Sequence, residues 1–146
     1  MQIKTLGHVV LKVRNLERSV QFYRDVLGMK EVARLRTSMV FFAFGKNHHD
    51  LALLQIGEMA ASPAPTSVGL YHVAFKVGDN LDELRELKKH LEQHKVPILG
   101  ASDHSVSQSL YIQDPDGIEI ELYVDADPTV WRDNPAALTT LKPLVL

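Results

Sequence analysis

The chain has 146 residues, 45% of them hydrophobic and 23% charged, with a formal net charge of −2. This length suits one domain, and the balanced charge gives no reason to expect nucleic acid or an anionic membrane as a partner. The absence of cysteine excludes disulfides, thiolate ligands and cysteine nucleophiles. No apolar run reaches the ~18 residues of a membrane span and no signal-peptide pattern opens the sequence, so we expect a cytoplasmic protein.

The first half of the sequence begins with the apolar stretch GHVVLKV, residues 7–13, which predicts a strand with His8 near its start. Residues 16–27 carry apolar side chains at steps of four, three and four, the pattern of an amphipathic helix. Asn15 is suited to cap this helix and Gly28 to end it in the left-handed conformation. Three further strands are predicted from apolar and β-branched stretches at residues 30–36, 38–44 and 50–56.

The second half repeats this order. The stretch YHVAFKV, residues 71–77, again predicts a strand, with His72 in the place of His8. Leucines at helical spacing over residues 81–91 predict a second helix, and Asn80 with Glu83 resembles a capping box at its start. Three strand-like stretches follow, at residues 96–102, 107–113 and 118–124.

Each half therefore reads strand–helix–strand–strand–strand, and we expect one domain built from two βαβββ modules. The modules are expected at about residues 3–57 and 68–125, with a linker at 58–67 that is rich in Pro, Ala and Ser and a tail at 126–146. We expect the tail to be irregular, with one helical turn near Val130 and Trp131. It is expected to pack onto the body through Trp131 and Leu138.

Strand alternation decides where the two histidines point. The apolar side chains that alternate with His8 and His72 are expected to meet the helices, so both imidazoles are expected on the opposite, concave surface. In the last strand, Glu119 and Glu121 lie on that same surface. Two neutral imidazoles and one carboxylate form a site that suits Fe(II) with open positions. The alternative for either histidine alone is a hydrogen-bonded core or surface residue.

Four stretches of the sequence resemble the vicinal oxygen chelate superfamily: GHVVLKV, NLERSVQFYRDVLGM, YHVAFKV and DPDGIEIELY, within about residues 3–125. The family includes glyoxalase I, fosfomycin resistance proteins, bleomycin-binding proteins and type I extradiol dioxygenases. The resemblance implies an α+β fold in which two βαβββ modules form a cup-shaped, metal-binding mixed β-sheet with helices outside. It also implies the metal ligands His8, His72 and Glu121, with Glu121 preferred to Glu119.

Within the superfamily that the sequence resembles, the activities differ in whether the protein supplies a fourth ligand to the metal. Glyoxalase I has a glutamate in the last strand of its first module, where this sequence has Ala52 or Leu53, neither of which binds metal. The stretch NHHDLAL resembles a segment of extradiol dioxygenases in which the second histidine, here His49, acts as an acid and base. The alternative is a solvated hairpin loop, and we take His48 as a loop residue.

Tyr111 matches a family tyrosine that hydrogen-bonds the substrate, and its alternative is a core tyrosine. Ser109 and Gln113 share the face of Tyr111, which favours the wall of a site. His104 is expected as a substrate contact, although strict spacing from Tyr111 would place the family histidine at Ser102.

These residues together predict an Fe(II)-dependent extradiol dioxygenase of the catechol 2,3-dioxygenase type, with a catechol-like substrate and dioxygen. Mn(II), Zn(II) or Ni(II) are the other metals considered, and a homodimer is expected. One alternative is a non-oxidative metalloenzyme, either an isomerase or epimerase or a thiol transferase of the fosfomycin type. The other is a metal-free binding protein of the bleomycin-resistance type.

Overall fold

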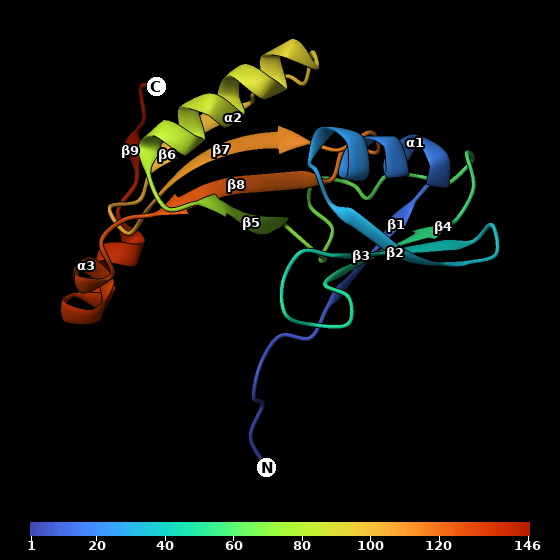
Figure 1. The fold of residues 1–146 in the computed structure, drawn as a ribbon, viewed down its shortest axis with the longest axis horizontal. Coiled ribbons are helices and arrows are strands. Elements are labelled where there is room, and N and C mark those ends of the chain that lie inside the picture. The colour runs from blue at the N-terminus through green and yellow to red at the C-terminus, as the bar shows by residue number, and fades with distance from the viewer. The chain divides into compact units, whose positions relative to one another are not determined.

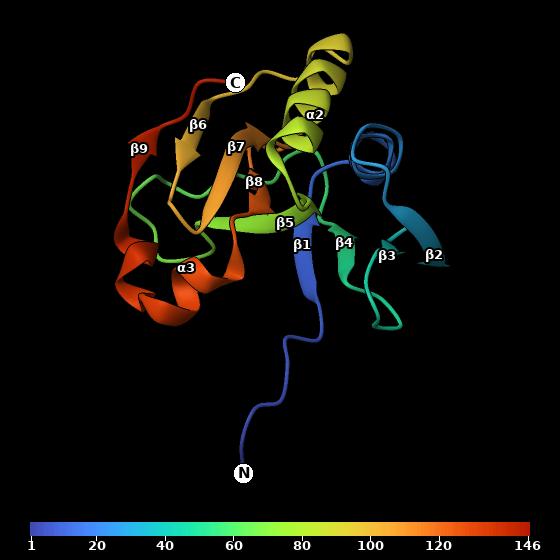
Figure 2. The same cartoon turned by 60° about the vertical axis from the view of Figure 1, so that its left-hand side comes forward.

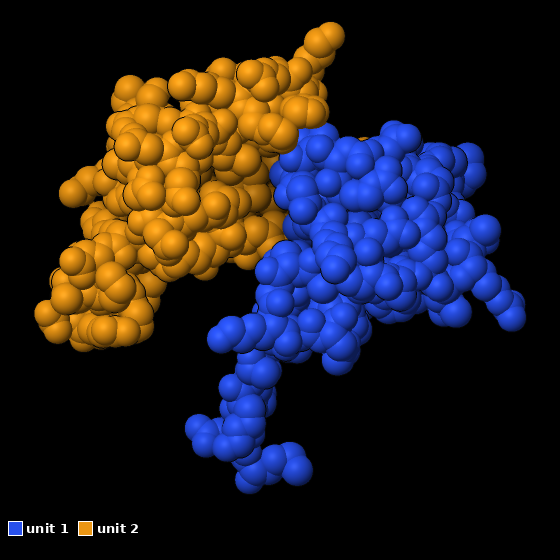
Figure 3. All heavy atoms as spheres, in the orientation of Figure 1, with its two compact units in different colours: residues 1–66 blue, residues 67–146 orange.

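The computed structural model describes residues 1–146, which form two compact units, residues 1–66 and residues 67–146 (Figure 3). The boundary falls inside the segment that is rich in Pro, Ala and Ser. Both units contain the βαβββ order, and together they form a mixed α+β fold with two sheets. None of the helices has the length and apolar character that crossing a bilayer requires.

Unit 1 contains a four-stranded sheet with the order β1-β4-β3-β2 (Figure 1). Its strands are β1 (Val9–Val13), β2 (Lys30–Leu35), β3 (Met39–Ala43) and β4 (Leu51–Gln55). The first and last strands pair in parallel, and the other neighbours pair antiparallel. The alternation predicted for β1 is confirmed, because Leu11 and Val13 are buried whereas Val10 and Lys12 are exposed.

The helix of unit 1 begins and ends where the sequence predicts, but its second half has a different geometry. Asn15 caps α1 (Leu16–Val20) by accepting a hydrogen bond from the Arg18 N–H at 3.0 Å. The chain then continues as a π-helical turn, η1 (Gln21–Val26), and Gly28 has a φ of 71°. The wider turn buries Phe22 and Tyr23, which are neighbours in the sequence, and leaves Leu27 half-buried. The α-helical geometry predicted at this end is therefore wrong, although Tyr23 of the predicted apolar stripe is buried.

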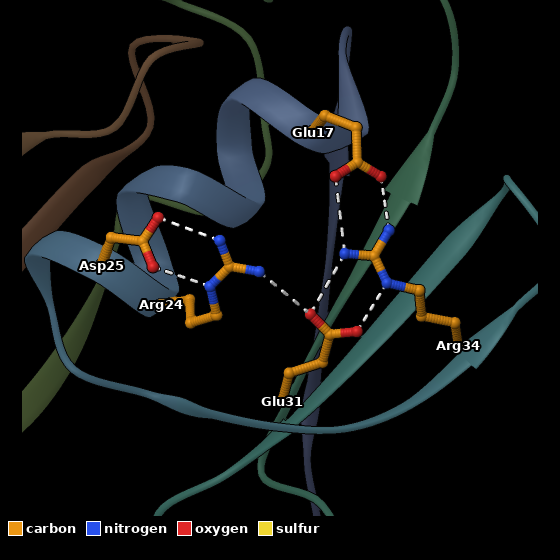
Figure 4. A network of polar contacts seen from close by, with 5 residues as sticks. All are labelled: Glu17, Arg24, Asp25, Glu31 and Arg34. Atoms are coloured by element: carbon orange, nitrogen blue, oxygen red, sulfur yellow. Dashed lines mark hydrogen bonds and ion pairs between the residues drawn. The ribbon is translucent and has the colours of Figure 1, made fainter.

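A network of charged side chains joins this helix to the edge strand β2 (Figure 4). The Arg34 guanidinium contacts Glu17 on α1 and Glu31 on β2, and Arg24 contacts both Asp25 and Glu31. Hydrogen bonds from Arg34 hold the pKa of Glu31 below its usual value. Because the pairs are exposed, each contributes little stability, but the charges also discourage other chains from pairing with this edge.

Unit 2 contains a five-stranded sheet with the order β5-β8-β7-β6-β9. Its elements are β5 (His72–Gly78), α2 (Leu81–Gln93), β6 (Gly100–Asp103), β7 (Ser107–Gln113), β8 (Glu119–Asp125), α3 (Pro128–Asp133), the 3₁₀ helix η2 (Pro135–Thr139) and β9 (Lys142–Pro143). The Asn80–Glu83 capping box is confirmed, and α2 packs on the sheet through Leu84 and Leu91 (Figure 1). In β8, alternate residues from Ile120 are buried, as predicted.

The tail has the helical turn predicted near Val130 and Trp131, but it is otherwise more regular than predicted. It forms α3, η2 and a short strand, β9, that pairs antiparallel with the edge strand β6 (Figure 2). Trp131 and Leu138 remain 43% and 63% exposed, whereas Ala137 is buried. The expectation that the tail packs through Trp131 and Leu138 is therefore wrong. Backbone pairing holds the segment instead, because it satisfies donors and acceptors that the edge of β6 would otherwise leave free.

Candidate metal centre and catalytic residues

Unit 2 brings two of the predicted ligands together. His72 opens β5 and Glu121 lies on the adjacent parallel strand β8, with His72 opposite Glu119 and Ala74 opposite Glu121 in the register. The His72 Nε2 atom lies 3.1 Å from Glu121 Oε2, and His72 Nδ1 lies 3.5 Å from Glu119 Oε1. Both carboxylates therefore face the same imidazole, one toward each ring nitrogen.

Glu121 is the more deeply placed of the two glutamates. Its side chain is 12% exposed, compared with 29% for Glu119. Ser109, fully buried on β7, donates a hydrogen bond of 2.6 Å to Glu121 Oε1. This bond orients the carboxylate and leaves Oε2 directed toward His72, which supports the choice of Glu121 over Glu119.

The donor atoms of His72 and Glu121 fit two neighbouring ligands of a divalent metal. Ligands at right angles on a metal with bonds of about 2.1 Å lie about 3 Å apart, close to the 3.1 Å between these atoms. Imidazole nitrogen and carboxylate oxygen are donors that Fe(II), Mn(II) and Zn(II) accept. His72 Nδ1 is buried without a hydrogen bond, since the contact to Glu119 is an ion-pair distance only. A carboxylate facing the second nitrogen is common for metal-binding histidines.

Tyr111 and His104 form a hydrogen-bonded pair on the same face. Tyr111 lies opposite Glu121 in the β7–β8 register, and its hydroxyl is 2.9 Å from His104 Nε2. Burial first, and then the negative charge of Glu121, raise the pKa of Tyr111 to about 12, so that it is a neutral phenol near pH 7. Ser102 pairs with Ser109 across the sheet, and His104 rather than Ser102 reaches the tyrosine hydroxyl.

Unit 1 gathers three imidazoles. His8 lies immediately before β1, and the centre of its ring is 4.3 Å from that of His49, in the loop between β3 and β4. The Nδ1 atoms of His48 and His49 are 2.6 Å apart, so the residue that we took as a loop residue belongs to the cluster. His48 lies in the loop, as predicted, and contacts the neighbouring His49. Partial burial, and then the charges of His8 and His48, lower the pKa of His49.

Asp50 shapes the loop that carries these histidines. Its Oδ2 atom accepts hydrogen bonds from the backbone N–H groups of Phe44 and Gly45, at 2.8 and 2.7 Å. Asn47 donates to Asp50 Oδ1 and also to the carbonyl oxygen of Gly7. The loop is therefore tied to the residue that precedes His8, which explains how His49 is brought beside it.

The position in unit 1 that corresponds to Glu121 is Ala52. Glu121 pairs with Ala74, two residues after His72, and Ala52 pairs with Val10, two residues after His8. Of the two candidates for the missing fourth ligand, the register selects Ala52 and not Leu53. Its methyl group is buried and cannot bind a metal. Within each unit, no three His, Asp or Glu side chains are arranged to hold a metal ion.

A groove of about 480 Å³ lies elsewhere in unit 2, between the end of α2, the strand β6 and the residues that follow β9. Leu110 lines it, whereas Tyr111, the next residue on β7, points to the other face. None of the predicted site residues lines this groove.

The family model of the Glyoxalase/Bleomycin resistance protein/Dioxygenase superfamily matches residues 5–122. The chain is 36% identical over 128 residues to a catechol-2,3-dioxygenase of Bacillus subtilis, covering 87% of this chain and 44% of the relative. It is 30% identical over 124 residues to a metallothiol transferase FosB of Staphylococcus haemolyticus, covering 83% of this chain and 84% of the relative. The chain thus spans less than half the length of that dioxygenase but most of the transferase.

A solved structure, that of a lactoylglutathione lyase from Agrobacterium tumefaciens, matches the fold with a TM-score of 0.67 and 27% identity. The match covers 85% of this chain and 96% of the lyase. These likenesses confirm the resemblance drawn from the sequence and the α+β fold class. The chain belongs to the glyoxalase, bleomycin resistance protein and dioxygenase superfamily.

Proposed function

We propose that this protein is an Fe(II)-dependent extradiol dioxygenase that cleaves the ring of a catechol-like substrate with dioxygen. The observation that carries the proposal is Ala52. It occupies the register position of Glu121 in the other unit, so the site lacks the fourth carboxylate implied for glyoxalase I. The likeness to the catechol-2,3-dioxygenase of Bacillus subtilis supports the same activity.

His72 and Glu121 would hold the metal from unit 2, and His8 would be the ligand from unit 1. When bound, Fe(II) would supply Lewis acidity toward a vicinal diol and redox chemistry with dioxygen. Glu119 would orient His72 through its second ring nitrogen, and Ser109 would orient Glu121.

The remaining residues act on the substrate itself. His49, on the loop beside His8, would accept and return a proton of the substrate. Tyr111 would hydrogen-bond a substrate oxygen as a neutral phenol, and His104 would hold the tyrosine in place. Holding the reacting groups in one orientation can lower the activation barrier of an enzymatic reaction by up to about 7–11 kcal/mol.

The direct test is anaerobic purification, loading with Fe(II), and measurement of oxygen uptake with a panel of catechols. We expect one metal per chain and uptake that yields a ring-opened semialdehyde acid. The His94→Ala variant, on the exposed end of α2, is the matched control and should keep full activity. Tight retention of Zn(II) with no oxygen uptake on any catechol would disprove the proposal. Sedimentation of the same preparation tests the expected homodimer.

A second candidate is a thiol transferase, favoured by one observation. The match to the metallothiol transferase covers 84% of that relative, whereas the match to the dioxygenase covers 44%. For this activity, protein loaded with Mn(II), Zn(II) or Ni(II) should consume a thiol in the presence of an electrophilic epoxide without consuming oxygen. Thiol consumption and oxygen uptake therefore separate the two candidates.

A further inference from the structure

The segment after β8 returns to the candidate site at one backbone atom, the carbonyl oxygen of Thr140. The Thr140 N–H bonds the Ala137 carbonyl at 3.0 Å, which ends η2, and β9 begins two residues later with Lys142 opposite Asp103. The Thr140 carbonyl is thus held from both sides. Its oxygen lies 3.1 Å from His104 Nδ1.

This contact determines which nitrogen of His104 carries the hydrogen. A carbonyl oxygen can only accept a hydrogen bond, so Nδ1 must be the donor. In the neutral ring, Nε2 then has a free lone pair and must be the acceptor. Its partner at 2.9 Å is the hydroxyl of Tyr111, which therefore donates its only hydrogen to His104.

Glu121 is the other acceptor near Tyr111, and its negative charge acts on the phenol. A carboxylate oxygen can accept two hydrogen bonds, so Glu121 competes with His104 for the phenolic hydrogen. His104 Nε2 has no hydrogen of its own in the neutral ring, and its 2.9 Å contact with the Tyr111 oxygen therefore requires that hydrogen.

We propose that the C-terminal segment, residues 126–146, completes the candidate site: the Thr140 carbonyl holds His104 in the Nδ1–H tautomer, and His104 thereby orients the hydroxyl of Tyr111. His104 is then a positioning residue. Because the phenolic hydrogen is committed to His104, only the lone pairs of the Tyr111 oxygen remain for a ligand. The ligand group that Tyr111 recognises is therefore a hydrogen-bond donor such as a protonated hydroxyl, and this part rests on the proposed function.

The tautomer is tested by ¹⁵N–¹H NMR of the histidine rings in the metal-free protein, with the His104→Asn variant to assign the signals. We expect His104 to show a protonated Nδ1 and an unprotonated Nε2. A protonated Nε2 in the resting protein, with or without Nδ1, would overturn the proposal. This result is independent of any enzymatic activity.

The contribution of the tail is tested by an amide-to-ester replacement at the Thr140–Leu141 bond, which weakens the Thr140 carbonyl as an acceptor without changing a side chain. We expect the Nδ1–H population of His104 to fall measurably. The same replacement at the Val145–Leu146 bond, beyond β9, is the matched control and should leave the population unchanged. Equal spectra for the two esters would show that the tail does not select the tautomer.

The positioning role is tested in the metal-loaded protein by two amides of different length. The His104→Gln amide can reach the Tyr111 hydroxyl, whereas the shorter His104→Asn amide can keep only the Thr140 contact. We expect kcat to fall about tenfold in His104→Asn and to stay within about threefold in His104→Gln, with metal content unchanged in both. Equal kcat losses in the two variants would contradict the role. Inactivity of the unsubstituted protein toward catechols would instead contradict the proposed function and leave the NMR result standing.

Discussion

The two units share one architecture and differ in what they place beside their first histidine. In both, the first strand pairs in parallel with the fourth, β1 with β4 and β5 with β8. The residue two positions after the histidine lies opposite a residue of that fourth strand. In unit 2 that partner is Glu121, oriented by Ser109, whereas in unit 1 it is Ala52. Unit 1 instead adds His48 and His49 from a loop. The comparison teaches that one duplicated backbone can place an oriented carboxylate beside the first histidine in one copy and further imidazoles beside it in the other.

The largest expected effect comes from removing the carboxylate that distinguishes unit 2. Glu121→Ala should lower metal affinity by more than about 100-fold, because loss of residues that merely support a ligand already costs about 10–100-fold. Metal titration by calorimetry measures this, and turnover should disappear with the metal. Glu119→Ala is the matched control, with a loss of no more than about 100-fold. A larger loss in Glu119→Ala than in Glu121→Ala would reverse the assignment of the ligand.

The second prediction concerns a substitution that gives unit 1 a carboxylate at the position equivalent to Glu121 of unit 2. Ala52→Glu places a carboxylate at the position equivalent to Glu121, beside Phe41, whose ring contacts His49. We expect it to retain metal and to lose most of its oxygen uptake, because the added carboxylate would take an open position.

The control for this substitution is Ala52→Gln, which has the same size without the charge. Burying either group costs stability, so thermal unfolding is measured with and without metal. Metal should raise the unfolding temperature of Ala52→Glu more than that of Ala52→Gln. Equal shifts would show that the residue does not face the metal.

The third prediction concerns the imidazoles of unit 1. His49→Ala should lower kcat by about 10²–10⁴-fold, the usual contribution of a general acid or base, while metal affinity stays unchanged. His8→Ala should lower metal affinity itself. Steady-state kinetics with parallel metal titration separates the two effects, and full turnover in His49→Ala would remove the acid–base role.

The smallest effect is expected in the loop that holds these imidazoles. Backbone hydrogen bonds, first from Phe44, hold the pKa of Asp50 below its usual value. This carboxylate therefore stabilises the fold above the unfolded pKa of about 3.9, and the contribution is lost as pH falls through its lower folded pKa. Asp50→Ala should cost about 1 kcal/mol at pH 7, and the cost should shrink at acid pH. Denaturant unfolding at pH 7 and pH 3 measures it, and a cost that does not depend on pH would contradict the charge-based explanation.

Local patterns were sufficient for the elements whose causes lie in neighbouring residues. The cap at Asn15, the capping box of Asn80 and Glu83, and the end of the helix at Gly28 follow from side-chain and backbone chemistry within a few positions. Alternation in β8 likewise separated the buried Ile120 from Glu121. The combination of His8 from unit 1 with His72 and Glu121 from unit 2 stays a prediction.

The sequence by itself determined the duplicated βαβββ order, the family and which side chains share a strand face, because periodicity and capping act over short distances. Only the tertiary structure decided that Ala52 is the counterpart of Glu121, that His49 lies beside His8, and that Thr140 reaches His104. Each of these depends on strand register or on where a loop or tail returns. Such returns are set by the pairing of backbone groups and the packing of residues far apart in the chain, which no local pattern records.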